Sequence, residues 1–223
     1  AKSLFNKPIN LLGMDACLMA MVEVAYEIRE SSNLMVASQE SVPGEGWDYA
    51  TLLESLVNNP NMDEIQLAYI IADSFISQFP LQDVNISVTD LNQLEELTAS
   101  IRQLSKAILS DNQTSPQIYI EIGDTSQFYS DYDYIDLGDF SQLLTTDRRV
   151  RSSEVKSAAF MVSNLLSQVI LYNRTRGSGV ENSHGLSIYF PFKSYNPQYE
   201  LLAFNRDTSW NQVIQKLFAL RKK

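Results

Sequence analysis

Short apolar segments alternate along this chain with longer segments whose apolar residues recur every three or four positions. The short segments are typical of buried β-strands, and the longer ones of amphipathic helices that cover a sheet. The expected strands are residues 9–14, 34–37, 85–88, 118–122 and 186–190. The expected helices are residues 18–30, 50–58, 64–79, 91–108, 154–172 and 201–220. This alternation predicts an α/β protein with a three-layer α/β/α architecture and a mostly parallel central sheet.

The composition narrows the class of protein further. The 223 residues are 44% hydrophobic, which is enough for a substantial core, and no apolar run is long enough to span a membrane. A formal net charge of −10 disfavours nucleic acid or an anionic membrane surface as a partner and suits basic substrates. The single cysteine excludes an internal disulfide and a cysteine-rich zinc site.

That cysteine, Cys17, stands where the first expected strand gives way to the first expected helix. In the first turn of a helix, unpaired backbone N–H groups and the positive end of the helix dipole favour a thiolate, the nucleophilic form of cysteine. Free cysteine is also among the most buried residue types, so a small core residue is an equally good interpretation of the position alone. In open α/β sheets ligands bind beyond the carboxyl ends of strands, where this pattern places Cys17.

A set of motifs extends in order over most of the chain. It comprises Asp15-Ala16-Cys17-Leu18-Met19, Glu23-Val24-Ala25-Tyr26, Val36-Ala37-Ser38-Gln39-Glu40, Pro43-Gly44-Glu45-Gly46-Trp47-Asp48-Tyr49, Asp136-Leu137-Gly138-Asp139-Phe140 and Gly185-Leu186-Ser187-Ile188-Tyr189-Phe190-Pro191. Together these motifs resemble the clostripain family of cysteine peptidases, which belongs to the same clan as caspases, legumain and gingipains. The resemblance implies a caspase-like fold with residues 9–14 as an interior strand and with additional helices in residues 50–110. It also implies a single peptidase domain over residues 1–223 that lacks its N-terminal strands.

The resemblance further implies that Cys17 is the nucleophile of an endopeptidase that cleaves after arginine or lysine through an acyl-enzyme. In this family the catalytic histidine comes from an upstream strand ending in a His-Gly segment, and the chain begins after that strand. We therefore expect an incomplete enzyme whose histidine arrives on a light chain cut from the same precursor, after a basic residue that precedes Ala1. A secreted or cell-envelope location in a bacterium is also implied. The alternative is a non-catalytic caspase-fold module that binds a basic peptide or a partner protein.

Asp15 is the leading candidate for contact with the substrate. It lies two residues before Cys17, so in a strand both side chains would point to the same side, where a carboxylate suits a basic substrate side chain. An N-cap of the following helix is an equally good interpretation of the residue type. The resemblance implies the specificity role. Further candidates, each with an equally good structural interpretation, are Glu45, Ser38, Gln39, Glu40 and Trp47.

His184 is the only histidine, so a catalytic dyad with Cys17 has to be considered. The resemblance places His184 just before the expected strand 186–190, where the family does not keep its base. We therefore favour a structural or surface histidine over the dyad.

An acidic, tyrosine-rich stretch from residue 129 to 134, with two further aspartates just after it, is expected to be an exposed loop. Its hard oxygen ligands make calcium a possible cofactor, although their spacing does not fit an EF-hand loop, and a solvated acidic loop is favoured. The residues concerned are Asp131, Asp133, Asp136 and Asp139. No other cofactor or metal is expected.

Overall fold

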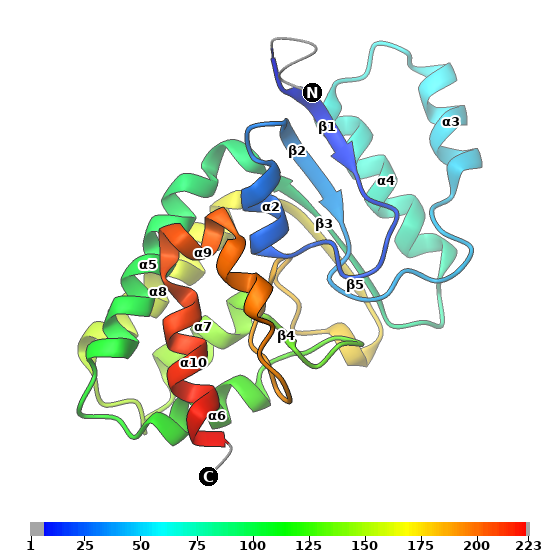
Figure 1. Ribbon diagram of the computed structural model, residues 1–223. Helices are drawn as coiled ribbons and strands as arrows, with labels where there is room; N and C mark the ends of the chain where they lie inside the picture. Colours follow the sequence, from blue (N-terminus) through cyan, green and yellow to red (C-terminus); the bar gives the residue numbers. More distant parts are fainter. Residues whose placement is uncertain (1–6, 222–223) are drawn as a thin grey trace.

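The computed structural model describes residues 7–221, and its elements are shown in Figure 1. The strands are β1 (Ile9–Gly13), β2 (Ser32–Ala37), β3 (Val84–Asp90), β4 (Tyr134–Asp136), β5 (Ile170–Arg176) and β6 (Ser187–Tyr189). The α-helices are α2 (Val22–Ile28), α3 (Tyr49–Asn58), α4 (Glu64–Gln78), α5 (Leu94–Ser110), α6 (Pro116–Thr125), α7 (Leu137–Thr146), α8 (Ser153–Val169), α9 (Ala203–Thr208) and α10 (Trp210–Arg221). Within the described residues no helix is long and apolar enough to cross a membrane.

The main sheet has the strand order β1-β2-β3-β5. β2 is parallel to β1, and β3 is antiparallel to both of its neighbours, so β1, β2 and β5 run in one direction and β3 in the other. The reversal of β3 follows from the connection before it: α3 and α4 return the chain to the end of the sheet where β2 finishes. The predicted α/β class is confirmed. In the described sheet β1 is an edge strand, whereas the sequence analysis expects an interior strand there.

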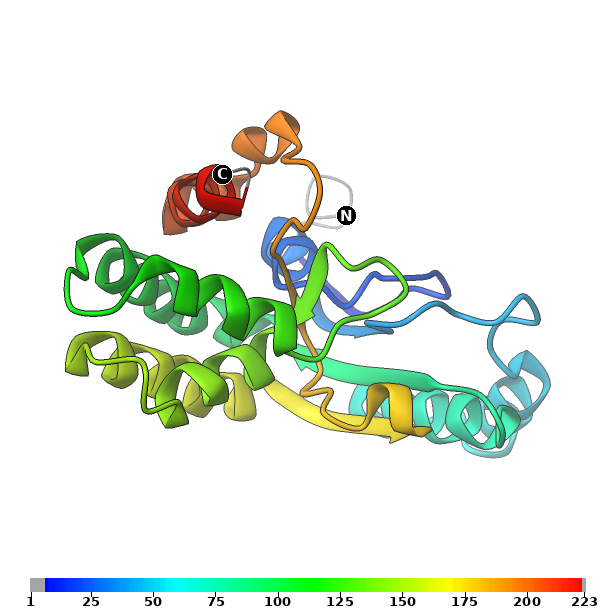
Figure 2. The same cartoon turned by 90° about the horizontal axis from the view of Figure 1, so that it is seen from below.

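The two faces of the sheet are covered by different helices, and Figure 2 shows α2 and α4 on opposite sides of the strands. α4 contacts all four strands, and Phe75 from this helix packs in one buried cluster with Ile86 and Val88 of β3. Because side chains alternate along a strand, β3 turns Ser87 toward the other face, where its hydroxyl donates to the Gly185 carbonyl at 2.6 Å. The larger core on that side joins α2 to the helices α5–α10. The three-layer arrangement is confirmed.

Residues 118–122 are helical, within α6, and the predicted strand is wrong. The three isoleucines alternate in sequence, but Ile118 and Ile122 are also four residues apart and therefore share a helical face. Ser115 and Pro116 start the helix, since proline at the first helical position has no N–H to leave unsatisfied. Helix-start chemistry therefore outweighs a period-two pattern that spans only five residues.

Two expected helices have different limits in the structure. The helix expected over 154–172 ends at Val169, because residues from Ile170 onward pair with β3 as the strand β5. The helix expected over 201–220 is divided into α9 and α10 by Ser209, whose φ of 58° is left-handed. The strand expected over 186–190 is confirmed as β6, although it pairs with β4 in a separate two-stranded sheet.

Candidate active site

The candidate site lies where β1 and β2 end side by side. Because these two strands are parallel, the segments that follow them, residues 14–21 and 38–48, leave the sheet at the same edge. Backbone hydrogen bonds join the two segments: the Leu18 N–H donates to the Glu40 carbonyl at 3.3 Å and the Ala20 N–H to the Ser38 carbonyl at 2.9 Å. This strand-end position is the usual location of a ligand site in an open α/β sheet.

Cys17 is exposed, with a free thiol, on the segment after β1. It is not in the first turn of a helix as the sequence suggests, because α2 begins only at Val22, and Leu18 between them has a left-handed φ of 61°. The sulfur therefore receives its hydrogen bond from a backbone amide of the neighbouring segment and not from the N–H groups of a helix terminus. The Val42 N–H donates to Sγ of Cys17 at 3.3 Å, and the Val42 carbonyl accepts from the thiol at 3.7 Å. The sulfur is thereby held in place while it remains accessible to a substrate.

Asp15 is held by hydrogen bonds from Trp47, near the end of the segment 38–48, and from Tyr49, the first residue of α3. Its Oδ2 accepts from the Trp47 N–H and from the Tyr49 hydroxyl, each at 3.1 Å. Gly46 (φ 69°) lies so close that a Cβ there would be 2.6 Å from Oδ2, so only glycine fits this approach. The N-cap interpretation is wrong, because Met21 is the N-cap of α2.

The other oxygen of that carboxylate, Asp15 Oδ1, is buried and has no hydrogen-bond partner within the described residues. A buried carboxylate oxygen without a donor costs free energy, on the order of 1–3 kcal/mol. A cationic group that reached Asp15 would remove this cost. The site therefore contains an exposed thiol two residues from a carboxylate that lacks one donor.

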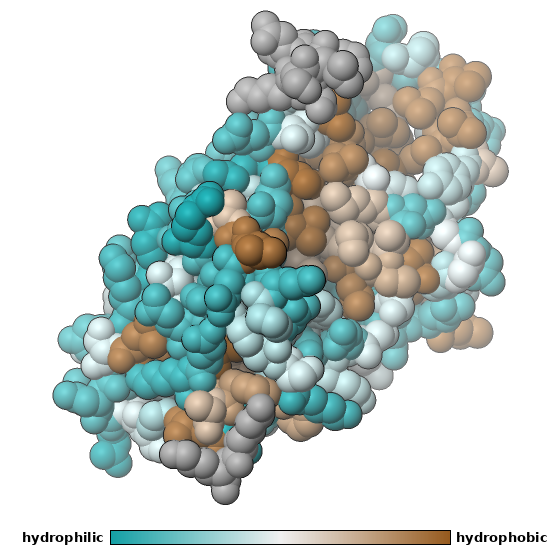
Figure 3. Space-filling view, in the orientation of Figure 1, coloured by the Kyte–Doolittle hydropathy of each residue, from teal (hydrophilic) through white to brown (hydrophobic). Residues whose placement is uncertain are grey.

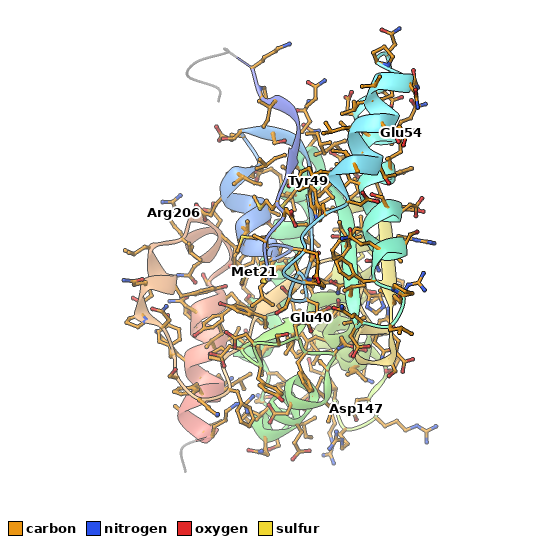
Figure 4. The ribbon with its side chains drawn as sticks, turned by 90° about the vertical axis from the view of Figure 1, so that its right-hand side faces the viewer. Met21, Glu40, Tyr49, Glu54, Asp147 and Arg206 are labelled. Carbon is orange, nitrogen blue, oxygen red and sulfur yellow. The ribbon has the colours of Figure 1, made fainter. Side chains whose placement is uncertain are left out.

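Trp47 forms a wall behind Asp15. Its side chain is buried, and its ring lies against Gly13 at the end of β1, where a Cβ would be only 2.8 Å from a ring carbon. Its indole N–H has no partner within the described part of the chain. Glu45 is exposed on the same loop, next to the Gly46 that touches Asp15. Figure 4 shows Tyr49 at the start of α3 and Glu40 on the preceding loop.

The side chains of residues 38–40 support the loop from beneath. Gln39 is buried, and its Oε1 accepts from the Gly185 N–H at 3.0 Å. Glu40 accepts from the Ser130 N–H at 3.1 Å. Ser38 is buried as well. In this structure Ser38 and Glu40 contribute backbone carbonyls to the Cys17 segment, while the side chains of Gln39 and Glu40 hold the loop to the rest of the molecule.

Asp136 anchors this loop and is buried, so the expectation that it is a solvated acidic residue is wrong. Its carboxylate is fully buried, and Oδ2 accepts from Gln39 Nε2 at 2.8 Å and from the Tyr129 hydroxyl at 3.0 Å. Oδ1 accepts from the Asp139 N–H at 2.7 Å, so Asp136 is also the N-cap of α7. The spacing of Asp136 and Asp139 at the start of an apolar segment is a helix-start signal that could have identified this role.

Asn85 is a second residue that sequence reasoning missed. Its Oδ1 accepts from the backbone N–H groups of Gln39 and Glu40 at 2.9 and 3.0 Å. A buried polar side chain in the middle of a strand can be recognised as part of a site only when the face of the sheet on which it lies is known. The contact of Val42 with Cys17 and that of Tyr49 with Asp15 likewise become apparent only in the folded chain.

His184 is also hydrogen-bonded to Asp136. Its Nδ1 lies 2.8 Å from Asp136 Oδ1, and its Nε2 lies 2.8 Å from the Gln142 side-chain amide. The hydrogen bond with Asp136 raises the pKa of His184 above its usual value, although burial opposes the shift. Both ring nitrogens thus have partners different from those of Cys17, as expected for a structural histidine.

Replacing His184 by alanine is expected to leave most catalytic activity intact and to lower stability in a pH-dependent way. Because the folded-state pKa of His184 is raised, its charged pair with Asp136 stabilises the fold below about pH 6.5, and this contribution is lost as pH rises through the higher folded-state value. Urea unfolding should therefore show a larger difference from wild type at about pH 5.5 than at about pH 9. A loss of turnover by several orders of magnitude, with the fold intact, would instead identify the dyad.

The carboxylates considered for calcium mostly have protein partners. Asp133 accepts from the Phe192 N–H at 2.7 Å, and Asp139 accepts from the Gln127 N–H at 2.6 Å. Among residues 7–221 no three histidine, cysteine, aspartate or glutamate side chains are grouped to hold a metal ion. A calcium requirement stays a prediction, and no step below uses a metal.

Comparison with known proteins defines the class to which this fold and site belong. The clostripain family profile matches residues 2–216. Clostripain from Hathewaya histolytica is 26% identical over an alignment of 238 positions, gaps included, that covers 87% of this chain and 45% of that protein. The chain thus spans about half the length of this curated relative.

Two solved structures share the fold. A clostripain from Bacteroides thetaiotaomicron, in complex with a peptide inhibitor, has a TM-score of 0.70 at 19% identity and covers 92% of this chain and 90% of that one. An inactive zymogen of a C11 protease from Parabacteroides distasonis has a TM-score of 0.69 at 20% identity, covering 91% and 59%. These likenesses show that the fold is shared with C11 proteases, and the family profile over residues 2–216 defines the family. The chain belongs to the clostripain family.

Proposed function

We propose that this chain is the cysteine-bearing part of an endopeptidase that cleaves polypeptides after lysine or arginine. The observation that carries the proposal is the pairing, at one strand end, of the exposed Cys17 thiol with Asp15, whose Oδ1 is buried without a donor. In this proposal the sulfur attacks the scissile peptide bond while the basic side chain of the substrate pairs with the carboxylate.

The reaction proceeds by nucleophilic catalysis. The Cys17 thiolate attacks the carbonyl carbon of the scissile bond, and a C–S bond forms as the carbonyl oxygen takes up negative charge. The C–N bond then breaks, and the amine leaves with a proton from an imidazolium. Water attacks the resulting thioester with the same imidazole as base, and the C–S bond breaks to regenerate the thiolate. Backbone N–H groups, including that of Cys17, stabilise the oxyanion.

The histidine for these proton transfers is supplied by an upstream segment, as a light chain of the same precursor. The free edge of β1 supports this assignment, because in the described sheet its outward N–H and C=O groups have no neighbouring strand. Apolar residues lie on this side of the molecule, with Leu12 half-buried in β1 and Leu53 and Val57 exposed on α3. Figure 3 shows hydrophobic residues gathered over β1 and α3. A strand that paired with β1 would cover them and bring its carboxyl end beside Cys17.

Specificity for a basic P1 residue, the residue on the amino side of the cut bond, comes from Asp15. Trp47 and Tyr49 fix the orientation of its carboxylate through Oδ2, which leaves Oδ1 for the ammonium or guanidinium of the substrate. Glu45 adds a second negative charge on the exposed rim. A secreted location and activation by cleavage belong to the same proposal, since one relative is described as secreted and another as a zymogen.

The proposal is tested by covalent labelling of Cys17. A peptidyl ketone that carries lysine at P1 and a leaving group on the ketone should attach one equivalent to Cys17 when the upstream segment is co-expressed. The 223-residue chain alone should react on the order of 100-fold more slowly or less, because the general acid–base group is missing. Intact-mass measurement is unambiguous because the chain has a single cysteine.

The matched control is the same reagent with norleucine in place of lysine, which should label poorly in both samples. Equal labelling rates with and without the upstream segment would contradict the two-chain part of the proposal. No labelling and no proteolysis in the co-expressed sample would favour the non-catalytic module.

A further inference from the structure

A cavity lies between α2, the β4–β6 pair and the turn Pro197–Leu201. Its volume is about 380 Å³, within the range of small-ligand sites. Its walls are mainly apolar or aromatic and include Met21, Val24, Ile28, Tyr134, Tyr199 and Leu202. Met21, labelled in Figure 4, belongs to the segment that leads from Cys17 into α2. Neither the proposed reaction nor its specificity uses this cavity.

Glu23 is the buried acid of this cavity. Only 3% of its surface is exposed, and its Oε1 accepts from the Tyr189 N–H at 2.9 Å and the Tyr199 hydroxyl at 2.8 Å. Its Oε2 is buried and has no partner within the described residues. Burial raises the pKa of Glu23 to about 7, so the carboxylate is held at a free-energy cost that a cation would offset.

The other residues that line the cavity also favour a cation. Glu27, one helical turn after Glu23, adds a second carboxylate, and among the described residues that line the cavity none is basic. The rings of Tyr189 and Tyr199 lie side by side with centroids 4.9 Å apart. Aromatic faces and carboxylates both attract cations, whereas an anion would be repelled and a purely apolar ligand would leave Oε2 unpaired.

We propose that this cavity binds an organic cation, a primary ammonium carried on an aliphatic stem, with the charged group at Glu23 and the stem along Val24, Ile28 and Leu202. None of its lining residues is Asp15 or Cys17, and the site does not depend on the proposed peptidase activity. A free alkylamine and a lysine side chain of a polypeptide share this chemistry.

The test measures binding by titration calorimetry in the Asp15→Asn variant, which removes the other buried carboxylate that lacks a donor within the described residues. n-Pentylammonium represents the free amine, and Nα-acetyl-lysine N-methylamide represents a lysine within a chain. We expect saturable binding of at least one of the two, and the tighter ligand indicates the natural source. n-Pentanol, with the same stem and no charge, should bind at least tenfold more weakly.

The variant Asp15→Asn/Glu23→Gln should lose at least tenfold in affinity while it keeps the fold, since glutamine preserves the acceptor for Tyr189 and Tyr199. Val24→Phe, which fills the cavity without removing the carboxylate, provides an independent variant and should also abolish binding. Equal affinity in the variants with and without Glu23, equal binding of pentanol, or no binding of either amine would each overturn the proposal.

Discussion

Replacing Cys17 by alanine is expected to lower kcat/KM for a peptide with lysine at P1 by about 10⁴-fold or more, because the nucleophile of covalent catalysis is removed. The fold should be unaffected: Cys17 is exposed, and within the described part of the chain its hydrogen bonds are made only with the Val42 backbone. The measurement is steady-state hydrolysis by the co-expressed protein, with thermal unfolding of both proteins as the check on stability.

Cys17→Ser is the matched control for this variant. It keeps the size and the polar contacts of the side chain but replaces the thiolate by a hydroxyl that is a much weaker nucleophile at neutral pH, so it should also be nearly inactive. The alanine variant should leave any precursor cut before Ala1 unmade if that cut is self-processing. Persistent hydrolysis by a pure, correctly folded Cys17→Ala protein would refute the assignment of the nucleophile.

The position of the site could be predicted from the sequence, whereas its internal contacts could not. A short apolar strand followed by Asp15 and Cys17 is enough to place both at the carboxyl end of a strand. The donor to the sulfur could not be predicted in the same way. The helix that the sequence places at Cys17 begins five residues later, and the Val42 amide that donates to the sulfur comes from a separate loop. Which backbone group approaches a side chain is a property of the tertiary fold.

The roles of Gln39 and Asp136 show the same limit. Their residue types and neighbours suggested a pocket wall and a solvated acidic loop, but each finds in the other a buried hydrogen-bond partner 97 positions away in sequence. Burying a carboxylate is favourable only when several donors converge on it, and such convergence leaves no local pattern in the sequence. Hydrophobic periodicity predicted most helices and strands because it reports which face of an element is buried. It was wrong at residues 118–122, because the apolar residues of this short segment fit both the two-residue period of a strand and the spacing of a helix.

Asp15→Asn is expected to lower kcat/KM for substrates with arginine or lysine at P1 by on the order of 100-fold, because a partly shielded cation would lose its charged partner. Asparagine can still accept from Trp47 and Tyr49 through its side-chain oxygen, so the clasped loop should be preserved. The decisive comparison is between arginine and its neutral analogue citrulline at P1. Wild type should prefer arginine strongly, and the variant should lose most of that preference.

Glu45→Gln serves as the matched control for this substitution, because it removes one acidic charge from an exposed position on the same rim. A charge in contact with solvent is screened and contributes little, about 0–1 kcal/mol, so the arginine preference of Glu45→Gln should fall no more than about fivefold. The contrast follows from burial: Asp15 Oδ1 is buried and has no donor within the described residues, and in the proposal the substrate cation supplies one. If Glu45→Gln abolished the preference and Asp15→Asn retained it, the exposed rim rather than Asp15 would determine the specificity.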